Sequence, residues 1–104
     1  MEIQFTDQNF EEYAAQGKPM LIDFYADWCG PCRRLGPVVE QLAQKYEGQV
    51  LIGKCDADEN AALVERFGVR NIPAVFFLKG SEVVDKSIGA VPASMLEEKL
   101  QSIL

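Results

Sequence analysis

The fold is decided by the stretch from Met20 to Cys32, which reads MLIDFYADWCGPC. Its first six residues are almost continuously apolar, as in a central strand that is covered on both faces of a sheet. Gly30 and Pro31 then separate two cysteines, and proline favours the first turn of a helix. The stretch therefore predicts a buried strand that leads directly into a cysteine pair at the start of a helix.

Apolar periodicity in the rest of the chain alternates between strand and helix patterns. Residues 32–46 carry apolar side chains at three- and four-residue steps, which predicts a long helix that ends at Gly48. Residues 74–78 and 83–88 flank a Lys-Gly-Ser turn, which predicts an antiparallel hairpin. The other predicted elements are a strand at 3–5, a helix capped by Thr6-Asp7 and ended by Gly17, a strand at 50–55, a helix capped by Asp58 and ended by Gly68, and a final helix from Pro92 with Leu96, Leu100, Ile103 and Leu104 in one apolar stripe.

The order of these elements, βαβαβαββα, predicts an α/β fold. We expect a mixed central sheet of about five strands sandwiched by about four helices. The chain of 104 residues is long enough to bury a core, and it shows no internal repeat and no linker. We therefore expect a single domain that spans residues 1–104.

Composition and charge narrow the classes of partner. Ten basic and sixteen acidic residues give a formal charge of -6, and no stripe of Lys or Arg could follow a phosphate backbone, so we expect no nucleic acid. The first residues resemble no signal peptide, and the longest apolar run contains Asp23, so neither export nor membrane insertion is expected. Three cysteines cannot all pair, which favours a reducing compartment. We expect a cytoplasmic protein that acts as a monomer.

The Cys29-Gly30-Pro31-Cys32 motif predicts reversible thiol–disulfide chemistry. A cysteine at a strand-to-helix junction meets the free N–H groups and the positive dipole end of the helix, so Cys29 should ionise more easily than a free thiol. The spacing places the two Cα atoms about 5 to 6 Å apart, a separation that a disulfide tolerates. Pro31 leaves no N–H unsatisfied in the first turn, and Gly30 keeps the sulfur accessible to another chain.

Two other interpretations of the pair are half of a structural metal site and two buried thiols. The chain has no His and no second Cys-x-x-Cys to complete a metal site, so redox chemistry is favoured. Cys55 lies in a strand pattern without a neighbouring cysteine, and we interpret it as an unreactive core thiol.

Asp23 interrupts the apolar strand six residues before Cys29. Burial at this position should raise its pKa and allow it to move protons during thiol exchange. The alternative is a carboxylate at the edge of the sheet, where the strand twists. Lys54 alone would more commonly be a solvated lysine at a strand end.

Several motifs resemble the thioredoxin family over nearly the whole chain. They are FYADWCGPC at residues 24–32, Pro37, Asn71-Ile72-Pro73 and Ile88-Gly89-Ala90. The resemblance implies a protein-disulfide reductase that takes electrons from a thioredoxin reductase, reduces disulfides of partner proteins and contributes to cell redox homeostasis. It implies no bound cofactor, only a redox-active Cys29–Cys32 disulfide.

The resemblance also implies roles for single residues. Cys29 is the attacking thiolate, at the exposed start of the helix, and Cys32 is the resolving thiol, shielded by Trp28. Asp23 transfers protons with Lys54 as its basic partner. Pro73 is a cis-proline that faces the cysteines. The expected substrate-binding rim consists of Trp28, Gly30, Pro31, Ile72, Pro73, Gly89 and Ala90.

Three positions depart from the common family pattern, and two rival functions remain. Tyr25 stands where Trp is frequent, Arg33 where Lys is common, and Ala74 where Thr often follows the cis-proline. One rival is a disulfide-forming or isomerising enzyme on the same fold, which would need an oxidising compartment. The other is a binding module that clamps a protein without redox turnover. Two electron donors fit the family, an NADPH-dependent flavoprotein and a ferredoxin-linked reductase.

Overall fold

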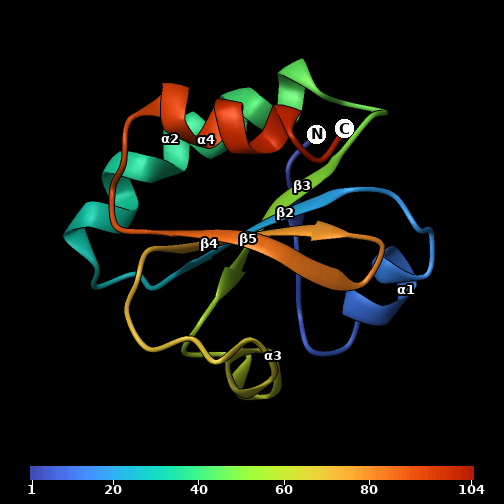
Figure 1. Ribbon diagram of the computed structural model, residues 1–104. Helices are drawn as coiled ribbons and strands as arrows, with labels where there is room; N and C mark the ends of the chain where they lie inside the picture. The colour runs from blue at the N-terminus through green and yellow to red at the C-terminus, as the bar shows by residue number, and fades with distance from the viewer.

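The structure is a computed structural model that describes residues 1–104 and contains one five-stranded sheet with four helices (Figure 1). None of the helices has both the length and the apolar character that a membrane crossing requires. The predicted α/β fold with a mixed central sheet is confirmed. Its elements are β1 (Ile3–Gln4), α1 (Phe10–Ala14), β2 (Met20–Tyr25), α2 (Gly30–Lys45), β3 (Leu51–Asp56), α3 (Ala61–Phe67), β4 (Ala74–Lys79), β5 (Glu82–Ile88) and α4 (Ala93–Gln101).

Strand β2 lies in the middle of the sheet, whose strand order is β1-β3-β2-β4-β5. It pairs in parallel with β3 and antiparallel with β4, and β4 and β5 form the predicted antiparallel hairpin. Helices cover both faces of the sheet, which explains why β2 is apolar at nearly every position. The prediction of a buried central strand before the cysteine pair is therefore confirmed.

Two apolar cores lie on opposite faces of the sheet. Helices α2 and α4 cover one face, while α1 and α3 cover the other (Figure 1). Side chains alternate along β2, so Leu21 packs in the α2 and α4 core, whereas Ile22 and Phe24 pack in the α1 and α3 core. Asp23 shares the face of Leu21. The alternation therefore points the only charged residue of β2 toward α2.

The predicted helix cap at Thr6-Asp7 is confirmed for Thr6, which caps the turn that leads into α1, and is wrong for Asp7. Helix α1 begins at Phe10, and before it the Thr6 Oγ1 accepts a hydrogen bond from the Asn9 N–H at 3.1 Å. The Asp7 carboxylate caps a different helix, because its two oxygens accept the N–H groups of Ala62 at 3.2 Å and Leu63 at 2.9 Å, in the first turn of α3. The sequence pattern at Asp7 predicts a cap, but the helix that Asp7 caps lies far along the chain.

Several other predicted boundaries need correction. Helix α1 ends at Ala14, and the chain turns before Gly17. Asn60, not Asp58, precedes α3, although Gly68 ends that helix in a left-handed conformation as expected. Pro92 precedes α4 instead of lying within its first turn. Leu104 is 53% exposed and leaves the apolar stripe, because the helix has already ended at Gln101.

Candidate functional site

Cys29 and Cys32 lie where β2 leads into α2, and they form a disulfide. Cys29 immediately precedes the first helical residue and has an extended backbone, while Pro31 lies in the first turn. The two Cα atoms are 5.3 Å apart, within the predicted range. The Cys32 backbone N–H donates to the Cys29 Sγ, with 3.2 Å between nitrogen and sulfur. A free helix N–H thus points at the first sulfur, where it would stabilise the negative charge of a thiolate.

The two sulfurs are covered almost equally in the disulfide form. Cys29 is 5% exposed and Cys32 is 4% exposed, so the expectation of an exposed Cys29 beside a shielded Cys32 is wrong for this state. The bond holds the sulfurs together, and Ala26, Tyr25 and Ile72 pack around them. Their positions still differ, because Cys29 precedes the helix and its Sγ lies 3.9 Å from the Ile72 carbonyl oxygen, whereas Cys32 lines a cavity.

Cys55 lies apart from this pair, in the core of the opposite face of the sheet. It is fully buried, and burial raises the pKa of its thiol to about 12, with smaller contributions from the negative charges of Asp7 and Asp56. A thiol that ionises so reluctantly is a poor nucleophile near neutral pH. Its environment supports the interpretation of Cys55 as an unreactive core residue. No group of three or more His, Cys, Asp or Glu side chains is arranged to hold a metal ion.

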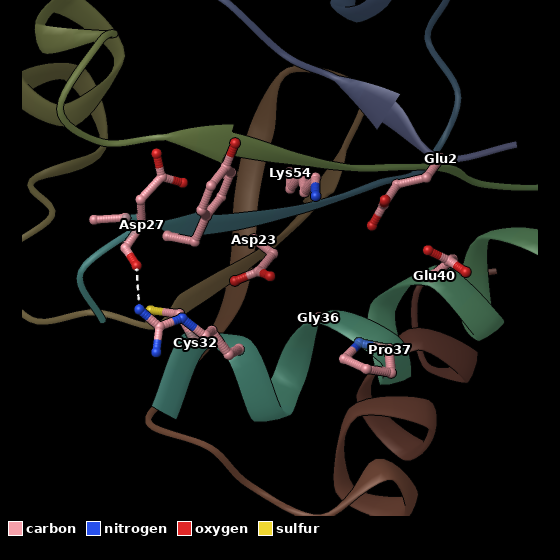
Figure 2. Close-up of a pocket in the computed structure, with 11 residues that line it drawn as sticks. Glu2, Asp23, Asp27, Cys32, Gly36, Pro37, Glu40 and Lys54 are labelled. Atoms are coloured by element: carbon pink, nitrogen blue, oxygen red, sulfur yellow. Dashed lines mark hydrogen bonds between the residues drawn. The ribbon is translucent and has the colours of Figure 1, made fainter. Parts of the chain in front are cut away.

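A cavity of about 390 Å³ adjoins Cys32 between the sheet and α2 (Figure 2). Asp23 points into it, is 1% exposed, and has one carboxylate oxygen, Oδ1, without a hydrogen-bond partner. The pKa of Asp23 is raised to about 7, chiefly by burial and also by the negative charge of Glu2, while the positive charge of Lys54 acts in the opposite direction. Because β2 is the central strand, the alternative of a sheet-edge carboxylate is wrong. The cavity is lined by Glu2, Asp23, Tyr25, Ala26, Asp27, Cys32, Arg33, Gly36, Pro37, Glu40 and Lys54.

Lys54 is the neighbour of Asp23 in the sheet. The two residues are paired in register between β3 and β2, so their side chains leave the same face. Lys54 is half-buried, and its Nζ lies 5.2 Å from the centre of the Tyr25 ring, a cation–π contact that stabilises the ammonium. It forms no ion pair with Asp23 within 4 Å and acts on it across the cavity. Lys54 is therefore not the solvated strand-end lysine that its sequence context favours.

The residues expected in the substrate-binding rim come from three separate segments. Ile72 packs against the cysteine pair, the Ile72–Pro73 peptide bond is cis, and the Gly89 N–H donates to the Pro73 carbonyl at 2.8 Å. These contacts bring the segments that contain Ile72 and Gly89 close to the segment that contains the cysteine pair. Pro73 itself is buried, so the accessible part of the rim is formed by Trp28, Gly30, Pro31, Ile72, Gly89 and Ala90.

Two polar contacts hold the loop between β2 and α2. Trp28 is 69% exposed, and its indole Nε1 donates to Asp58 Oδ2 at 2.9 Å. Arg33 Nη2 donates to the Asp27 carbonyl oxygen at 2.7 Å, as the dashed line in Figure 2 shows. This bond ties Trp28 to Asp58, in the loop between β3 and α3. The long side chain of Arg33 fastens its own helix to the loop before it.

Sequence reasoning missed Glu2 and Asp58. Glu2 belongs to the cavity because side chains alternate along β1, which directs Glu2 and Gln4 to the face that Ile3 does not occupy. Counting back from the strand pattern could have found it. The sequence pattern predicts Asp58 as a helix cap, and nothing in its local sequence indicates its bond to an indole thirty residues away.

Comparison with known proteins agrees with this geometry. The family model named Thioredoxin matches residues 2–102. The chain is 47% identical to a thioredoxin of Chlorobaculum thiosulfatiphilum over 96 residues, which cover 91% of this chain and 89% of that protein. It is 42% identical to thioredoxin 1 of Nostoc over 102 residues, which cover 97% of this chain and 95% of that protein.

These matches span the segments that build the site. The Cys29–Cys32 disulfide occupies the redox-active position of the family, at the start of the helix that follows the central strand. A dithiol at this position reduces a disulfide of a partner protein and becomes a disulfide itself, which a reductase then reverses. The chain therefore belongs to the thioredoxin family and is a protein-disulfide oxidoreductase that works by thiol–disulfide exchange through Cys29 and Cys32.

Proposed function

We propose that the protein is a cytoplasmic electron carrier that receives electrons from thioredoxin reductase and contributes to cell redox homeostasis. It acts as a monomer whose residues 1–104 form one thioredoxin domain. Its formal charge of -6 supports the monomer, since like charge opposes self-association, and it gives no attraction to nucleic acid. The observation that carries the proposal is the hydrogen bond from the Cys32 N–H to the Cys29 sulfur. This bond favours the thiolate form of Cys29, which is the form that attacks a disulfide.

Cys29 is the attacking thiolate, and Cys32 resolves the intermediate. In the reduced protein, the Cys29 thiolate attacks one sulfur of a substrate disulfide, and the other substrate sulfur leaves with the electron pair of the broken bond. Cys32 then attacks the Cys29 sulfur, the bond between Cys29 and substrate breaks, and the second substrate sulfur leaves as a thiolate. The substrate gains two electrons and the protein becomes the disulfide. Gly30 and Pro31 leave the approach to Cys29 open.

Asp23 transfers the proton that this second step requires. Cys32 must lose its thiol proton to attack, and both Cys32 and Asp23 line the same cavity. A carboxyl whose pKa is raised to about 7 is matched to proton transfer near neutral pH. Lys54 opposes the rise in pKa and keeps part of the Asp23 population ionised, so that a base is available.

Substrate proteins bind across the apolar rim around Cys29. An exposed Trp28 beside glycines and alanine gives a shallow apolar surface, and such surfaces usually mark interfaces. Ile72, whose carbonyl oxygen lies 3.9 Å from the Cys29 sulfur, and the following Pro73 accept an extended substrate segment, which suits a protein with many partners. The proposed rim is Trp28, Gly30, Pro31, Ile72, Pro73, Gly89 and Ala90.

Trapping of the mixed disulfide tests the assignment of attacker and resolver. Cys32→Ser should accumulate a covalent adduct with insulin through Cys29, whereas Cys29→Ser should form almost none. Cys55 is present in both variants and serves as the internal control. Non-reducing gels followed by mass-spectrometric mapping of the bridged cysteine provide the measurement. Equal trapping by both variants, or adducts mapped to Cys32 or Cys55, would overturn the assignment.

Two further measurements test the electron source and the location. The wild-type protein should couple NADPH oxidation to insulin reduction when a thioredoxin reductase is added, and Cys29→Ser should not. Failure of the wild-type protein would favour a ferredoxin-linked donor. Cell fractionation with an antibody should place the protein in the cytoplasmic fraction, and recovery from a membrane or exported fraction would contradict that part of the proposal.

A further inference from the structure

Two buried side-chain oxygens in the whole molecule lack a hydrogen-bond partner, and both line one cavity. They are Oδ1 of Asp23 and Oε2 of Glu2. Buried polar atoms in folded proteins are nearly always satisfied, so two orphans at one place indicate a local function rather than an accident of packing. The Asp23 orphan belongs to the proton-transfer group already proposed. The Glu2 orphan is not explained by any role described above.

The sheet brings these two carboxylates to one cavity although they belong to segments that are not neighbours in the sheet. Gln4 of β1 pairs with Lys54 of β3, and Lys54 pairs with Asp23 of β2, so β1 is separated from β2 by one strand. Glu2 leaves the start of β1 on the same face. In Figure 2, the carboxylates of Glu2 and Asp23 point into the cavity from two sides of Lys54, and Glu40 of α2 faces them.

The charges around the cavity are unbalanced. Its lining contains four carboxylates, two cations and one phenol: Glu2, Asp23, Asp27, Glu40, Arg33, Lys54 and Tyr25. Arg33 donates to the backbone beside Asp27, which leaves Lys54 as the cation that faces the other three carboxylates. Burial raises the pKa of Glu2, Lys54 lowers it, and Glu40 raises it. Full ionisation of this half-buried group of carboxylates is therefore costly, and a proton on one of them relieves the repulsion.

We propose that Glu2 is a positioning residue for the exchange reaction: its carboxylate, in the same cavity as Asp23, sets by its charge how readily Asp23 takes and returns a proton. The inference rests on the proton-transfer role proposed for Asp23. Because Asp23 is the more deeply buried of the two, it takes the proton, and Glu2 remains the more exposed and more easily ionised partner. Lys54 opposes this effect, so the pair of Glu2 and Lys54 sets the balance.

The balance matters because Asp23 must both take and return a proton. Ionised Asp23 accepts the proton of the Cys32 thiol while the Cys32 sulfur forms its bond to Cys29 and the bond from Cys29 to the substrate sulfur breaks. The substrate leaves as a thiolate with the electron pair and takes a proton from the surrounding solvent, to which Asp23 returns its own proton. Without the charge of Glu2, Asp23 becomes a weaker base toward the thiol, and the exchange slows.

The direct test is the titration of the Asp23 carboxyl carbon by ¹³C NMR in three variants of the disulfide form. Glu2→Gln removes the charge and keeps the shape, so the Asp23 midpoint should fall by about half a pH unit or more. Glu2→Asp keeps the charge and should retain most of the wild-type midpoint. Glu12→Gln, on the exposed surface of α1, removes one negative charge away from the cavity and should leave the midpoint unchanged. Equal midpoints in Glu2→Gln and Glu12→Gln would overturn the proposal.

The pH profile of insulin reduction separates this proposal from the role of Asp23 itself. Glu2→Gln should shift the profile toward lower pH in parallel with the carboxyl midpoint, and Glu2→Asp should restore it. In an Asp23→Asn background, the same Glu2 substitution should cause no further shift. If the midpoint moves and the rate profile does not, the proton-transfer role of Asp23 fails, and the catalytic part of the Glu2 proposal fails with it. If the midpoint does not move, only the Glu2 proposal fails.

Discussion

Asp7 and Asp23 place a carboxylate in the fold in opposite ways. Both oxygens of Asp7 accept backbone N–H groups at the start of α3, from Ala62 and Leu63. Asp23 is 1% exposed, yet one of its oxygens has no partner. The first arrangement satisfies a helix end and ties the β1–α1 loop to a distant helix. The second takes a carboxyl group out of water and leaves its Oδ1 without a hydrogen-bond partner.

The difference shows that one carboxylate stabilises the fold and that the other destabilises it. A capping carboxylate stabilises a protein by about 1 kcal/mol, while an unpaired buried carboxyl costs free energy whenever it ionises. Asp7 is therefore a structural residue, and its neighbour Asn60 extends the same junction by accepting the Asp7 N–H. The unpartnered, buried carboxyl of Asp23 fits the proton-transfer role proposed for it. Substitutions at the two positions should accordingly have opposite consequences.

Asp23→Ala should have the largest effect, a loss of about a hundredfold in the rate of insulin reduction, because a positioned acid–base group typically contributes that much. The variant should also be more stable than the wild type. Steady-state rates and denaturant unfolding on the same preparation provide the measurement. A destabilised variant with full activity would show that Asp23 is structural, like Asp7, and would remove the contrast between them.

The pH dependence of stability should reveal the cost of Asp23 directly. Burial raises the pKa of Asp23 to about 7 in the folded protein, against about 3.9 in an unfolded chain. Between these values the folded state binds the proton and the unfolded state does not, so this group makes stability fall as pH rises. The cost is absent below about pH 4 and complete above about pH 7.

The comparison with Asp23→Ala isolates this contribution from all other titrating groups. The variant should gain about 4 kcal/mol over the wild type at pH 8 and almost nothing at pH 4. Urea unfolding at the two pH values, with Asp7→Ala as the matched control at another aspartate, provides the measurement. A gain that is the same at both pH values would mean that packing, not ionisation, causes the stabilisation.

The cysteine site could be predicted because its parts are contiguous. An apolar run, a carboxylate within it and a Cys-x-x-Cys pair all lie between Met20 and Cys32, so strand, helix start and the unusual Asp23 follow from local rules. The closeness of Lys54 was implied by family resemblance alone. Strand register supplies its physical cause, since β3 pairs with β2 residue by residue.

The missed features depend on contacts between distant segments. The sequence around Asp7 predicts a cap, but it does not indicate which helix is capped, and the capped N–H of Ala62 is 55 residues away in the sequence. Glu2 reaches the cavity only because β1 adds to the edge of the sheet next to β3. Local propensity contains no information on such pairings. The nearly equal burial of Cys29 and Cys32 has a different cause. The disulfide bond holds the two sulfurs together, whereas the sequence prediction considers two separate thiols.

Asp7 gives the smallest and most graded test of the comparison. Asp7→Ala removes the acceptors of two N–H groups in the first turn of α3, so the free energy of unfolding should fall by about 1 to 2 kcal/mol. Asp7→Asn keeps one carbonyl oxygen and should lose about half as much, since one N–H remains satisfied. Both variants should retain the wild-type rate of insulin reduction below their unfolding transitions, because the junction of Asp7 with α3 does not line the Asp23 cavity. Urea unfolding and steady-state rates at pH 7 decide the matter. Full stability in Asp7→Ala, or a rate loss comparable with that of Asp23→Ala, would mean that the two aspartates do not divide structure and chemistry between them.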